Sequence, residues 1–508
     1  MMSTLQIGPL SEPLTGRSWS PDEIRARVAA RRSAYLQGGL KAQDRVFLHC
    51  GNTLEFFVEL LAIWSLRGCA VPVDVRLTAF ELGTLAESAS PVLSVWSSAP
   101  PDDAVAAITA GGARVVALDE ATGPGTTDAG APRGPVLDDD ALILFTSGTT
   151  GDPKGVVHTH RSLQARWMSL SMALDRSDFE RTLCLLPTHF GHGLICNCLF
   201  PWLSGNELHV LPPFRADMLM KLGGLIDDHG ITFLSSVPPV WRLALKTAKP
   251  PAGGSLRQVF CGSAPLTGAL WRQVQDWTGT AKVLNAYGIT ETASWLAGTT
   301  IPDLVPEDGL IGNMWGGSVA VLKAGETGGT TPDVEACATG ESGYVWVNTP
   351  ALMRGYFERQ DLTDLVVNGG WFSTGDIGYL DDRNRLYLRG REREEINKGG
   401  MKLFPNDVDS VVERFAGVRD VCTFGFDDAL YGENIGMALV MDSATTPELQ
   451  GLQEWMADHL AAHQLPVRWY LLDEIPRTSR GKINRASVAE SCRSLSPVDP
   501  KRLGGSRQ

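Results

Sequence analysis

The 508-residue sequence contains no run of ~18 uninterrupted apolar residues, the length needed to cross a membrane. Its most apolar stretch, Phe56–Leu66, is short and is interrupted by Glu59. The N-terminus lacks a basic segment followed by an apolar core, so we expect no signal peptide. Basic residues are in deficit, with 45 Lys and Arg against 58 Asp and Glu and a net charge of −13. The sequence therefore predicts a protein that binds neither membranes nor nucleic acids.

The cysteines follow neither a disulfide nor a metal-binding pattern. Their number, nine, is odd and their spacing is irregular, which is typical of reduced thiols in a cytoplasmic protein. Cys196 and Cys198 form a Cys-x-Cys pair within an apolar run, and we expect both to belong to the core because further ligands are missing nearby. Apolar residues make up 43% and charged residues 20%, as in ordinary globular proteins. The length suggests about three folding units.

Buried strands alternate with helices over the first half of the chain. Helices are expected at Arg25–Gln37 and Thr53–Leu66, and strands at Arg45–Cys50 and Cys69–Val73. Further strands are expected at Thr182–Leu186, Glu207–Leu211, Ile231–Ser235 and Gln258–Cys261. This alternation predicts βαβ units and a largely parallel sheet.

The pattern changes after Thr300. Short alternating segments at Ser318–Lys323, Gly343–Val347 and Arg385–Leu388 predict antiparallel hairpins or a small barrel. A compact unit with strands and two helices follows Gly390. Irregular segments are expected at Ala121–Asp140 (a linker), Gly325–Ser342 (a hairpin loop) and Ser494–Gln508 (a disordered tail).

The segment Leu142–Gly155, with the sequence LILFTSGTTGDPKG, is rich in glycine and hydroxyl groups. Glycine lets backbone N–H groups approach an anion, hydroxyls donate hydrogen bonds, and Lys154 adds a positive charge. The candidate anion-binding residues are Thr146, Ser147, Gly148, Thr149, Thr150, Gly151 and Lys154. The common P-loop pattern is absent. Composition alone leaves a polyphosphate site and a surface turn equally open.

The same segment resembles the phosphate loop of the adenylate-forming enzymes: acyl-CoA synthetases, peptide-synthetase adenylation domains and luciferases. Further segments resemble motifs of that family, in its order, over nearly the whole chain. They are Gly262-Ser263-Ala264-Pro265-Leu266, Asn285-Ala286-Tyr287-Gly288-Ile289-Thr290-Glu291-Thr292, Ser373-Thr374-Gly375-Asp376, Gly390-Arg391 with Lys398-Gly399-Gly400, and Pro476-Arg477-Thr478-Ser479-Arg480-Gly481-Lys482-Ile483. Any one of these residues alone would be a solvated charge or a helix cap; the ordered set argues for a site.

The resemblance implies an α/β fold. Its large N-terminal domain has two doubly wound αβ subdomains plus a small distorted β-barrel, and its small C-terminal domain is mobile and α+β. The implied boundaries are 1–389 for the large domain, 390–394 for the hinge, 395–493 for the small lid domain and 494–508 for the tail. At the hinge, Arg393 stands where family members often have Asp or Lys. Rotation there would replace Lys482 in the site with the face that carries Lys398 to Gly400.

The resemblance also implies ATP and Mg²⁺ as cofactors. Glu291 would bind Mg²⁺, Thr290 the α-phosphate, and Lys482 would lie between that phosphate and the substrate carboxylate. Asp376 and Arg391 would bind the ribose. The remaining implied nucleotide-binding residues are Gly262, Ser263, Ala264, Pro265, Asn285, Ala286, Tyr287, Gly288, Lys398, Gly399 and Gly400.

The acid pocket departs from the family pattern P-x-x-H-x-x-G, because Phe190 stands at the histidine position between His189 and His192. We expect His189 to act in the pocket and Phe190 to be its gate, although a helix N-terminal pair packed in the core is equally compatible. Further walls are expected at His192, Val237, Trp241 and Ile289. These walls predict an aromatic or medium, mostly uncharged acyl group.

The function implied is that of a carboxylate ligase, which forms an acyl-adenylate, releases pyrophosphate and transfers the acyl group to CoA. Three alternatives remain open. The protein could be an amide synthetase that uses an amine or amino acid, a freestanding loader of an acyl or peptidyl carrier protein, or a non-catalytic nucleotide-binding protein of the same fold.

Overall fold

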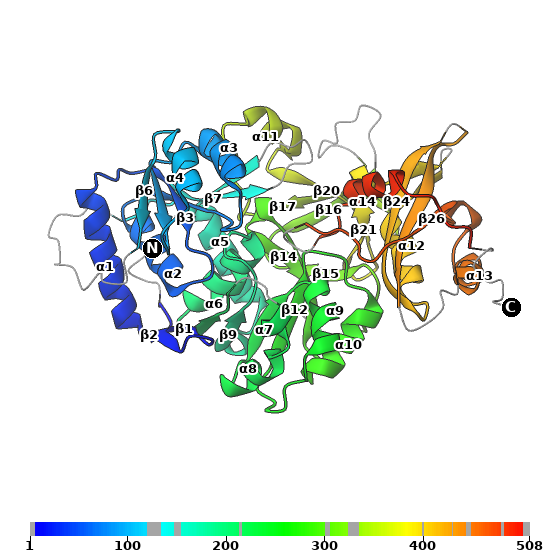
Figure 1. Cartoon of the computed structure of the whole chain (residues 1–508), viewed down its shortest axis with the longest axis horizontal. Coiled ribbons are helices and arrows are strands. Elements are labelled where there is room, and N and C mark those ends of the chain that lie inside the picture. The colour runs from blue at the N-terminus through cyan, green and yellow to red at the C-terminus, as the bar shows by residue number, and fades with distance from the viewer. Residues whose placement is uncertain are drawn as a thin grey trace.

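The computed structural model describes residues 6–118, 134–146, 154–212, 216–299, 305–323, 335–398, 401–428, 430–442, 449–478 and 482–500 (Figure 1). For Ala216, Arg393 and Lys402 it describes the backbone only. Most of the expected linker at 121–140 and part of the loop at 325–342 therefore lie outside the described residues. None of the helices within these ranges is long and apolar enough to cross a membrane.

The first sheet has seven strands in the order β18-β8-β7-β4-β3-β5-β6. Its strands are β3 (Arg45–His49), β4 (Cys69–Pro72), β5 (Leu93–Trp96), β6 (Arg114–Ala117), β7 (Asp140–Thr146), β8 (Lys154–Thr159) and β18 (Gly355–Tyr356). Strands β3 to β7 pair in parallel, whereas β8 and β18 add to one edge in antiparallel fashion. Helices α1 (Pro21–Gln37), α2 (Leu54–Ser65), α3 (Ala79–Ala89) and α4 (Asp102–Thr109) complete this unit.

Helix α1 begins at Pro21, earlier than the sequence predicted. Ser20 and Glu23 form a capping box, in which each side chain accepts a hydrogen bond from the other residue's backbone N–H. Helix α2 is almost wholly buried, as its continuous apolar sequence requires. Its buried carboxylate, Glu59, is neutralised by Arg31 of α1 at 2.6 Å, so the two helices pack without an unpaired charge.

The second sheet has fourteen strands, of which one part pairs in parallel and the other antiparallel. Its parallel part contains β1 (Leu10–Glu12), β10 (Glu207–Val210), β9 (Arg181–Cys184), β11 (Phe233–Ser236), β12 (Gln258–Gly262) and β13 (Val283–Ile289), with β2 (Arg17–Trp19) antiparallel at the edge. Helices α5 (His160–Ala173), α6 (Phe200–Trp202), α7 (Ala216–Leu219), α8 (Leu222–Asp228), α9 (Pro238–Thr247) and α10 (Gly268–Thr278) accompany it, together with a π-helix at His192–Leu199.

The strands expected to form hairpins or a barrel continue this second sheet beyond β13. They are β14 (Ser294–Gly298), β15 (Leu310–Met314), β21 (Leu386–Arg391), β20 (Trp371–Leu380), β17 (Gly343–Asn348), β16 (Ser318–Leu322) and β19 (Val367–Asn368). All of them pair antiparallel, and α11 (Gln360–Val366) precedes β19. The expected hinge at 390–394 spans the end of β21 and a 3₁₀ turn, Glu392–Glu394.

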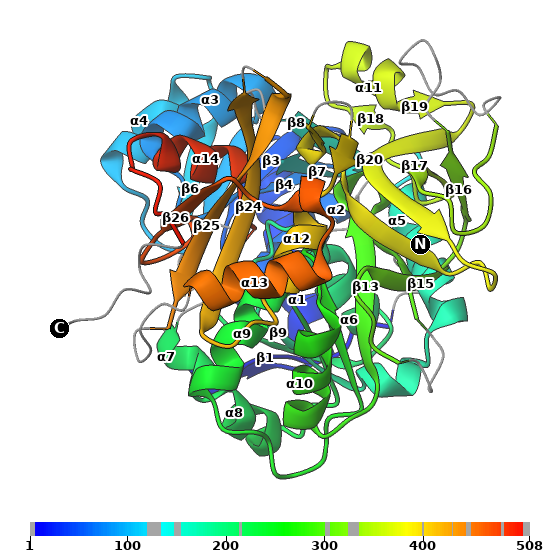
Figure 2. The same cartoon turned by 90° about the vertical axis from the view of Figure 1, so that its right-hand side faces the viewer.

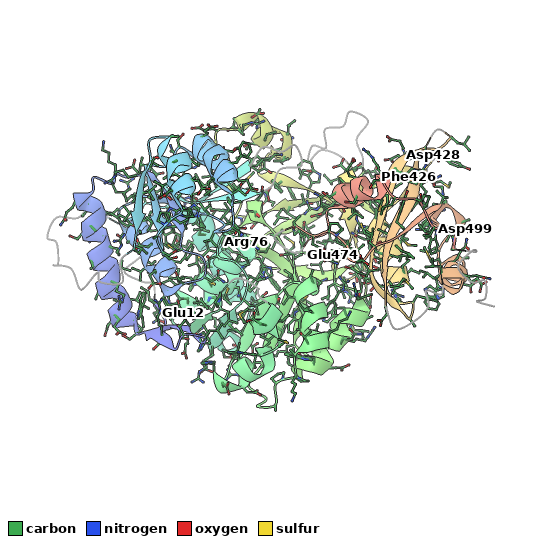
Figure 3. All side chains as sticks on the ribbon, in the orientation of Figure 1. Glu12, Arg76, Phe426, Asp428, Glu474 and Asp499 are labelled. Atoms are coloured by element: carbon green, nitrogen blue, oxygen red, sulfur yellow. The ribbon has the colours of Figure 1, made fainter. Side chains whose placement is uncertain are left out.

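The C-terminal domain is a five-stranded sheet covered on both faces. Its strands are β22 (Ile396–Lys398), β23 (Met401–Leu403), β24 (Val418–Asp428), β25 (Gly432–Met441) and β26 (Arg468–Leu471). Alternate residues of β25 face opposite sides, so one set packs with α12 (Pro405–Val412) and α13 (Leu449–His459) and the other with α14 (Arg485–Arg493). Phe426 and Asp428 lie at the far end of β24 (Figure 3).

Part of the segment expected to be a disordered tail is described and packs on this sheet. The backbone N–H of Val498 donates to Trp469 O at 2.8 Å, and Val498 is partly buried in the cluster that includes α13. Residues 501–508 lie outside the described residues.

Four histidines of the large domain are buried, and burial keeps their rings neutral at pH 7. Burial lowers the pKa of His49 and His192 to about 3, and that of His158 and His160 to about 4. Both ring nitrogens of His160 are buried without a hydrogen-bond partner, and the ring packs edge-on against Trp64 at 5.3 Å. The surroundings of His160 would therefore suit an apolar aromatic ring equally well.

We expect the free energy of unfolding to depend less steeply on pH in His160→Phe. Between about pH 6.5 and about pH 4 the unfolded chain binds a proton at this position and the folded protein does not. Protonation therefore favours unfolding as the pH falls, by about 1.4 kcal/mol per pH unit for each such histidine. Urea unfolding at pH 5, 6, 7 and 8 measures the slope. The exposed His459→Gln serves as control, and an unchanged slope in His160→Phe would contradict the expectation.

Candidate active site

A cavity of about 1320 Å³ is lined by both the large domain and the C-terminal domain. Figure 2 shows β24 and β25 lying in front of the large domain in that view. Candidate residues that are far apart in the sequence meet in its walls. These are Thr146, Lys154, Thr290, Glu291, Arg391 and Lys482.

Thr146 and Lys154 mark the two ends of the candidate phosphate loop. They are register partners in the β7–β8 pair, and Thr146 Oγ1 donates to Lys154 O at 3.4 Å. The intervening candidates, Ser147, Gly148, Thr149, Thr150 and Gly151, lie outside the described residues. The strand pairing brings both ends of the loop to one edge of the cavity.

Asp376 is held by two partners next to the cavity. Arg391 Nε contacts its Oδ1 at 2.6 Å, and the Tyr287 hydroxyl donates to its Oδ2 at 2.5 Å. The negative charge of Asp376 raises the pKa of Arg391. Of these three residues Arg391 lines the cavity, together with Thr374 and Gly375 of β20. The Asp376 carboxylate is thereby fixed in orientation, and both it and Tyr287 are absent from the described cavity walls.

The backbone carbonyls of the 3₁₀ turn Thr290–Thr292 accept hydrogen bonds from residues outside the turn. His158 Nε2 donates to Thr290 O at 2.7 Å, and the backbone N–H of Met353 donates to Glu291 O at 2.7 Å. Arg166 Nη2 donates to Thr292 O at 2.9 Å and its Nη1 to Trp315 O at 2.9 Å. Arg166 is 1% exposed, and burial lowers its pKa to about 10. A buried cation thus anchors the turn that carries Glu291.

The Glu291 side chain is oriented by a hydrogen bond from Tyr356. The Tyr356 hydroxyl donates to Glu291 Oε1 at 2.8 Å, and burial raises the pKa of that hydroxyl above its ordinary value. Lys154 Nζ lies 5.8 Å from the centroid of the Tyr356 ring. All three residues line the cavity. Tyr356 therefore lies between Glu291, the candidate metal ligand, and Lys154 at the end of the candidate phosphate loop.

His192 is buried, and it lines the same cavity as Lys482. Its ring nitrogens contact Ser235 Oγ at 2.6 Å and Ser263 Oγ at 2.9 Å. Burial, and then the nearby charge of Lys482, lower the pKa of His192. The ring packs against Trp295 at 5.6 Å and lies 5.9 Å from Phe190. Ser263 holds a left-handed backbone (φ +64°), which costs a non-glycine residue ~1–2 kcal/mol.

Three candidates for the acid pocket lie elsewhere. His189 is absent from the described cavity walls, and its Nε2 contacts Asp74 Oδ2 at 3.3 Å. Asp74 also binds Arg76, which is labelled in Figure 3. Val237 and Trp241 belong to the core around α8, α9 and α10, where Trp241 packs against Trp277 at 5.6 Å. Phe190, His192 and Ile289 do line the cavity.

The segment at the end of β12 approaches β13 closely. A side chain on Gly262 would place its Cβ 2.1 Å from Ala286 O, so glycine is required there. Ser263, Ala286 and Gly288 line the cavity, whereas Asn285 donates to Leu310 O at 2.8 Å. Of the remaining candidates, Ala264 and Pro265 are absent from the described walls.

Lys482 lines the cavity from the segment that precedes α14. Arg477 and Ile483 form an isolated β-bridge, and the backbone N–H of Thr478 donates to Lys482 O at 2.8 Å. Arg477 is tied to Asp420 of β24 at 2.6 Å. Lys398 lies on β22, away from the described walls, with its Nζ 5.9 Å from the ring centroid of Tyr431. Gly399 and Gly400 lie outside the described residues.

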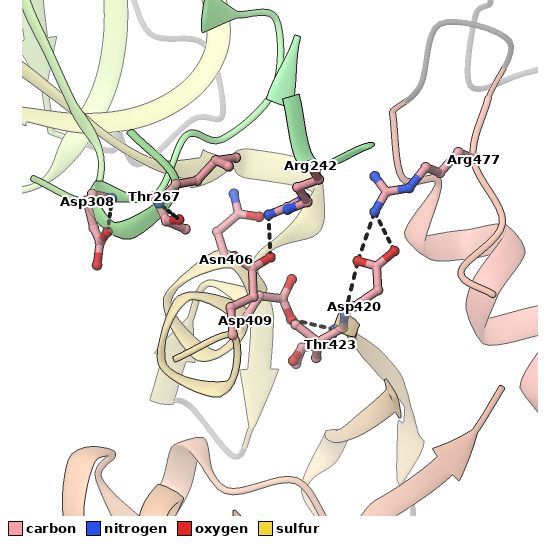
Figure 4. Close-up of polar contacts among 12 residues, drawn as sticks. Arg242, Thr267, Asp308, Asn406, Asp409, Asp420, Thr423 and Arg477 are labelled. Atoms are coloured by element: carbon pink, nitrogen blue, oxygen red, sulfur yellow. Dashed lines mark hydrogen bonds and ion pairs between the residues drawn. The ribbon is translucent and has the colours of Figure 1, made fainter. Parts of the chain in front are cut away.

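Ion pairs hold the C-terminal domain in this position. Arg242 of α9 contacts Glu413 at 2.6 Å, and Arg414 contacts Asp308. Figure 4 shows this region, including Arg242, Asp308 and Asp409 of α12. Both pairs join the large domain to the residues that follow α12, and none of the four residues is among the described cavity walls. The position of Lys482 therefore depends on contacts formed outside those walls.

The comparisons with known proteins agree with this geometry. Residues 14–357 match the family model of AMP-binding enzymes, and residues 407–482 match that of the AMP-binding enzyme C-terminal domain. The chain therefore belongs to the AMP-binding enzyme family, and the expected adenylate-forming superfamily is confirmed.

Individual relatives cover nearly the whole chain. An oxalate–CoA ligase from Arabidopsis thaliana is 30% identical over 467 residues, which cover 89% of each chain. Two solved structures share the fold: ATP-bound MatB from Rhodopseudomonas palustris (TM-score 0.85, 24% identity, 97% of each chain) and the amide bond synthetase McbA from Marinactinospora thermotolerans (TM-score 0.83, 21% identity, 96% of this chain and 98% of that one).

Sequence reasoning missed the residues that support the motif residues. Tyr356, Arg166, His158 and Trp295 have no motif of their own. One signal was available: Ser162 and Arg166 are four residues apart, which places both polar side chains on one face of α5. His158, at the end of β8, contacts that face through Ser162 Oγ at 3.1 Å.

Proposed function

We propose that this protein is an ATP- and Mg²⁺-dependent carboxylic acid–CoA ligase, which activates an organic acid as its acyl-adenylate. The observation that carries the proposal is the convergence of Lys482 from the C-terminal domain with Lys154, Thr290 and Glu291 of the large domain on one cavity. Membership of the AMP-binding enzyme family supports it, as does the naming of relatives as CoA ligases.

In the first step a carboxylate oxygen attacks the α-phosphorus of ATP, and the bond from that phosphorus to the bridging oxygen of pyrophosphate breaks. Both reactants are anions, so the site must neutralise charge and hold them in line. Lys482 would bind the carboxylate and the α-phosphate together, and Thr290 would donate to the α-phosphate. The loop Ser147–Gly151 and Lys154 would hold the leaving pyrophosphate. Asp376 and Arg391 would hold the ribose, beside the adenine-binding segments around Gly262 and Tyr287.

The residues fit a magnesium ion. Within the described ranges there is no group of three or more His, Cys, Asp or Glu side chains that could hold a metal. Mg²⁺ is commonly bound by one or two carboxylates together with substrate phosphates, and Glu291 supplies such a carboxylate in the cavity wall. The ion would supply neutralising charge at the phosphates. Tyr356 would keep the carboxylate of Glu291 turned toward it.

In the second step the CoA thiol would attack the acyl carbonyl, AMP would leave and the thiol proton would pass to solvent. We propose that the C-terminal domain (395–493) turns about residues 390–394, withdraws Lys482 and presents the face that carries Lys398, Gly399 and Gly400. The amine, amino acid and carrier-protein acceptors remain alternatives to CoA for this step. A cytoplasmic location is proposed because all nine cysteines are free thiols.

Pyrophosphate release tests the proposal directly. The purified protein is given ATP, Mg²⁺ and a panel of aryl and aliphatic acids, and then CoA, amino acids and amines in separate reactions. Mass spectrometry of the products identifies the acceptor. An acyl-CoA product supports the proposal, an amide product supports the alternative acceptor, and a protein that consumes no ATP with any acid contradicts both.

Lys482→Ala should slow adenylate formation by about 10²–10³-fold, or roughly 3–4 kcal/mol, because a positive charge is lost where negative charge concentrates. ATP–pyrophosphate exchange measures this step alone. Lys323→Ala, an exposed lysine paired with Glu335, is the matched control. Exchange near the wild-type rate in Lys482→Ala would remove Lys482 from the reaction.

Tyr356→Phe should raise the Mg²⁺ concentration needed for half-maximal exchange by about 10-fold, because partners that orient a ligand typically affect metal affinity by 10–100-fold. The exchange rate at saturating Mg²⁺ should fall much less. Tyr379→Phe, whose ring stacks on Tyr387 at 4.8 Å, provides a control of the same chemistry. If both variants required the same Mg²⁺ concentration as the wild type, Tyr356 would not orient a metal ligand.

A further inference from the structure

The end of the cavity beside Lys482 is bounded by aromatic and small side chains. His192 and Lys482 both line the cavity, and burial and then the charge of Lys482 lower the pKa of the His192 ring. Phe190, Ser263 and Trp295 surround His192 at the distances given above, and Ser294 and Ile289 complete the wall. If Lys482 binds the reacting carboxylate, the rest of the acid must lie among these residues.

Trp295 forms the floor of this end of the cavity, by which we mean the wall that packs directly on the aromatic core. Its side chain is 1% exposed, and its ring centroid lies 4.6 Å from that of Phe260 and 5.9 Å from that of Phe233. Phe260 stacks in turn on Trp315 at 5.3 Å. The Trp295 backbone N–H donates to Cys196 Sγ at 3.3 Å, so its main chain is also anchored. A longer acyl chain could extend in this direction only by displacing a close-packed aromatic core.

The described residues around His192 offer no positive charge to the far end of an acid. Among the described cavity-lining residues the basic side chains are Lys154, Lys482, Arg391 and Arg485. Lys154 and Arg391 belong to the nucleotide end, and Arg485 contacts Asp409 at 2.7 Å within the C-terminal domain. His192 has both nitrogens engaged by serine hydroxyls. A second carboxylate would therefore be buried without a cation beside it, which is costly.

We propose that the acid activated here is a monocarboxylic acid with a short, uncharged tail, either a single aromatic ring or a short aliphatic chain, and that Trp295 sets its length. The acid carboxylate lies at Lys482, and its tail lies between Phe190 and Trp295 over the Ser263–His192 pair. This assignment rests on the proposed function and narrows the substrate class of the same cavity.

The test compares kcat/KM for pyrophosphate release with benzoate, butanoate, hexanoate, decanoate, hexadecanoate, oxalate and malonate. We expect benzoate, butanoate or hexanoate to exceed hexadecanoate and both diacids by about 100-fold or more, the scale of discrimination that an unpaired buried group or a steric block produces. Highest activity with a diacid or with hexadecanoate would overturn the assignment. If no acid releases pyrophosphate, the proposed function itself fails.

Trp295→Leu should raise the ratio of kcat/KM for decanoate over that for hexanoate by about 10-fold, because it opens space beneath the floor. Trp241→Leu is the matched control: Trp241 is equally buried, at 0% exposure, and packs in another core. It should lower stability without moving the ratio. Trp295→Phe, a smaller change, serves if Trp295→Leu does not fold. The assignment of Trp295 fails if the ratio moves no more in Trp295→Leu or Trp295→Phe than in Trp241→Leu.

Discussion

The cavity depends on one lysine of the C-terminal domain, Lys482, which faces the same space as the cations and hydroxyls of the large domain. Thr146, Lys154 and Arg391 occupy walls that are built by β-strand pairing, and Lys482 completes them from a different folding unit. A site for two anions needs that concentration of positive charge, yet a permanently closed one could not exchange its contents. Dividing the charge between two domains satisfies both requirements.

The ion pairs between the domains explain how the closed position is kept. Arg242 with Glu413, and Arg414 with Asp308, are only partly buried, and such pairs contribute modest free energy. Pairs of this strength are compatible with the proposed rotation of the C-terminal domain. The rigid parts of the site lie within the large domain, where Arg166, His158 and Met353 hold all three carbonyls of the turn that carries Glu291.

Much of the site could be read from the sequence because the residues proposed to bind nucleotide stand in short, ordered motifs. Thr146, Lys154, Glu291, Arg391 and Lys482 were all expected, and all line one cavity. The acid pocket was harder to predict. His189 and Trp241 are chemically suitable, but one pairs with Asp74 and the other packs with Trp277. Neighbouring positions on a turn or helix point in different directions, so residue type alone does not say which of them faces a ligand.

The sequence by itself determined the alternation of strands and helices, the family, and the motif residues, because hydrophobic periodicity and short motifs are local properties of the chain. Only the tertiary structure decided which side chains support them. Tyr356 and Trp295 acquire their positions from strand pairing and from packing between elements distant in the sequence. The same holds for Arg166, whose charge is tolerated in the core only because the carbonyls of a remote turn reach it.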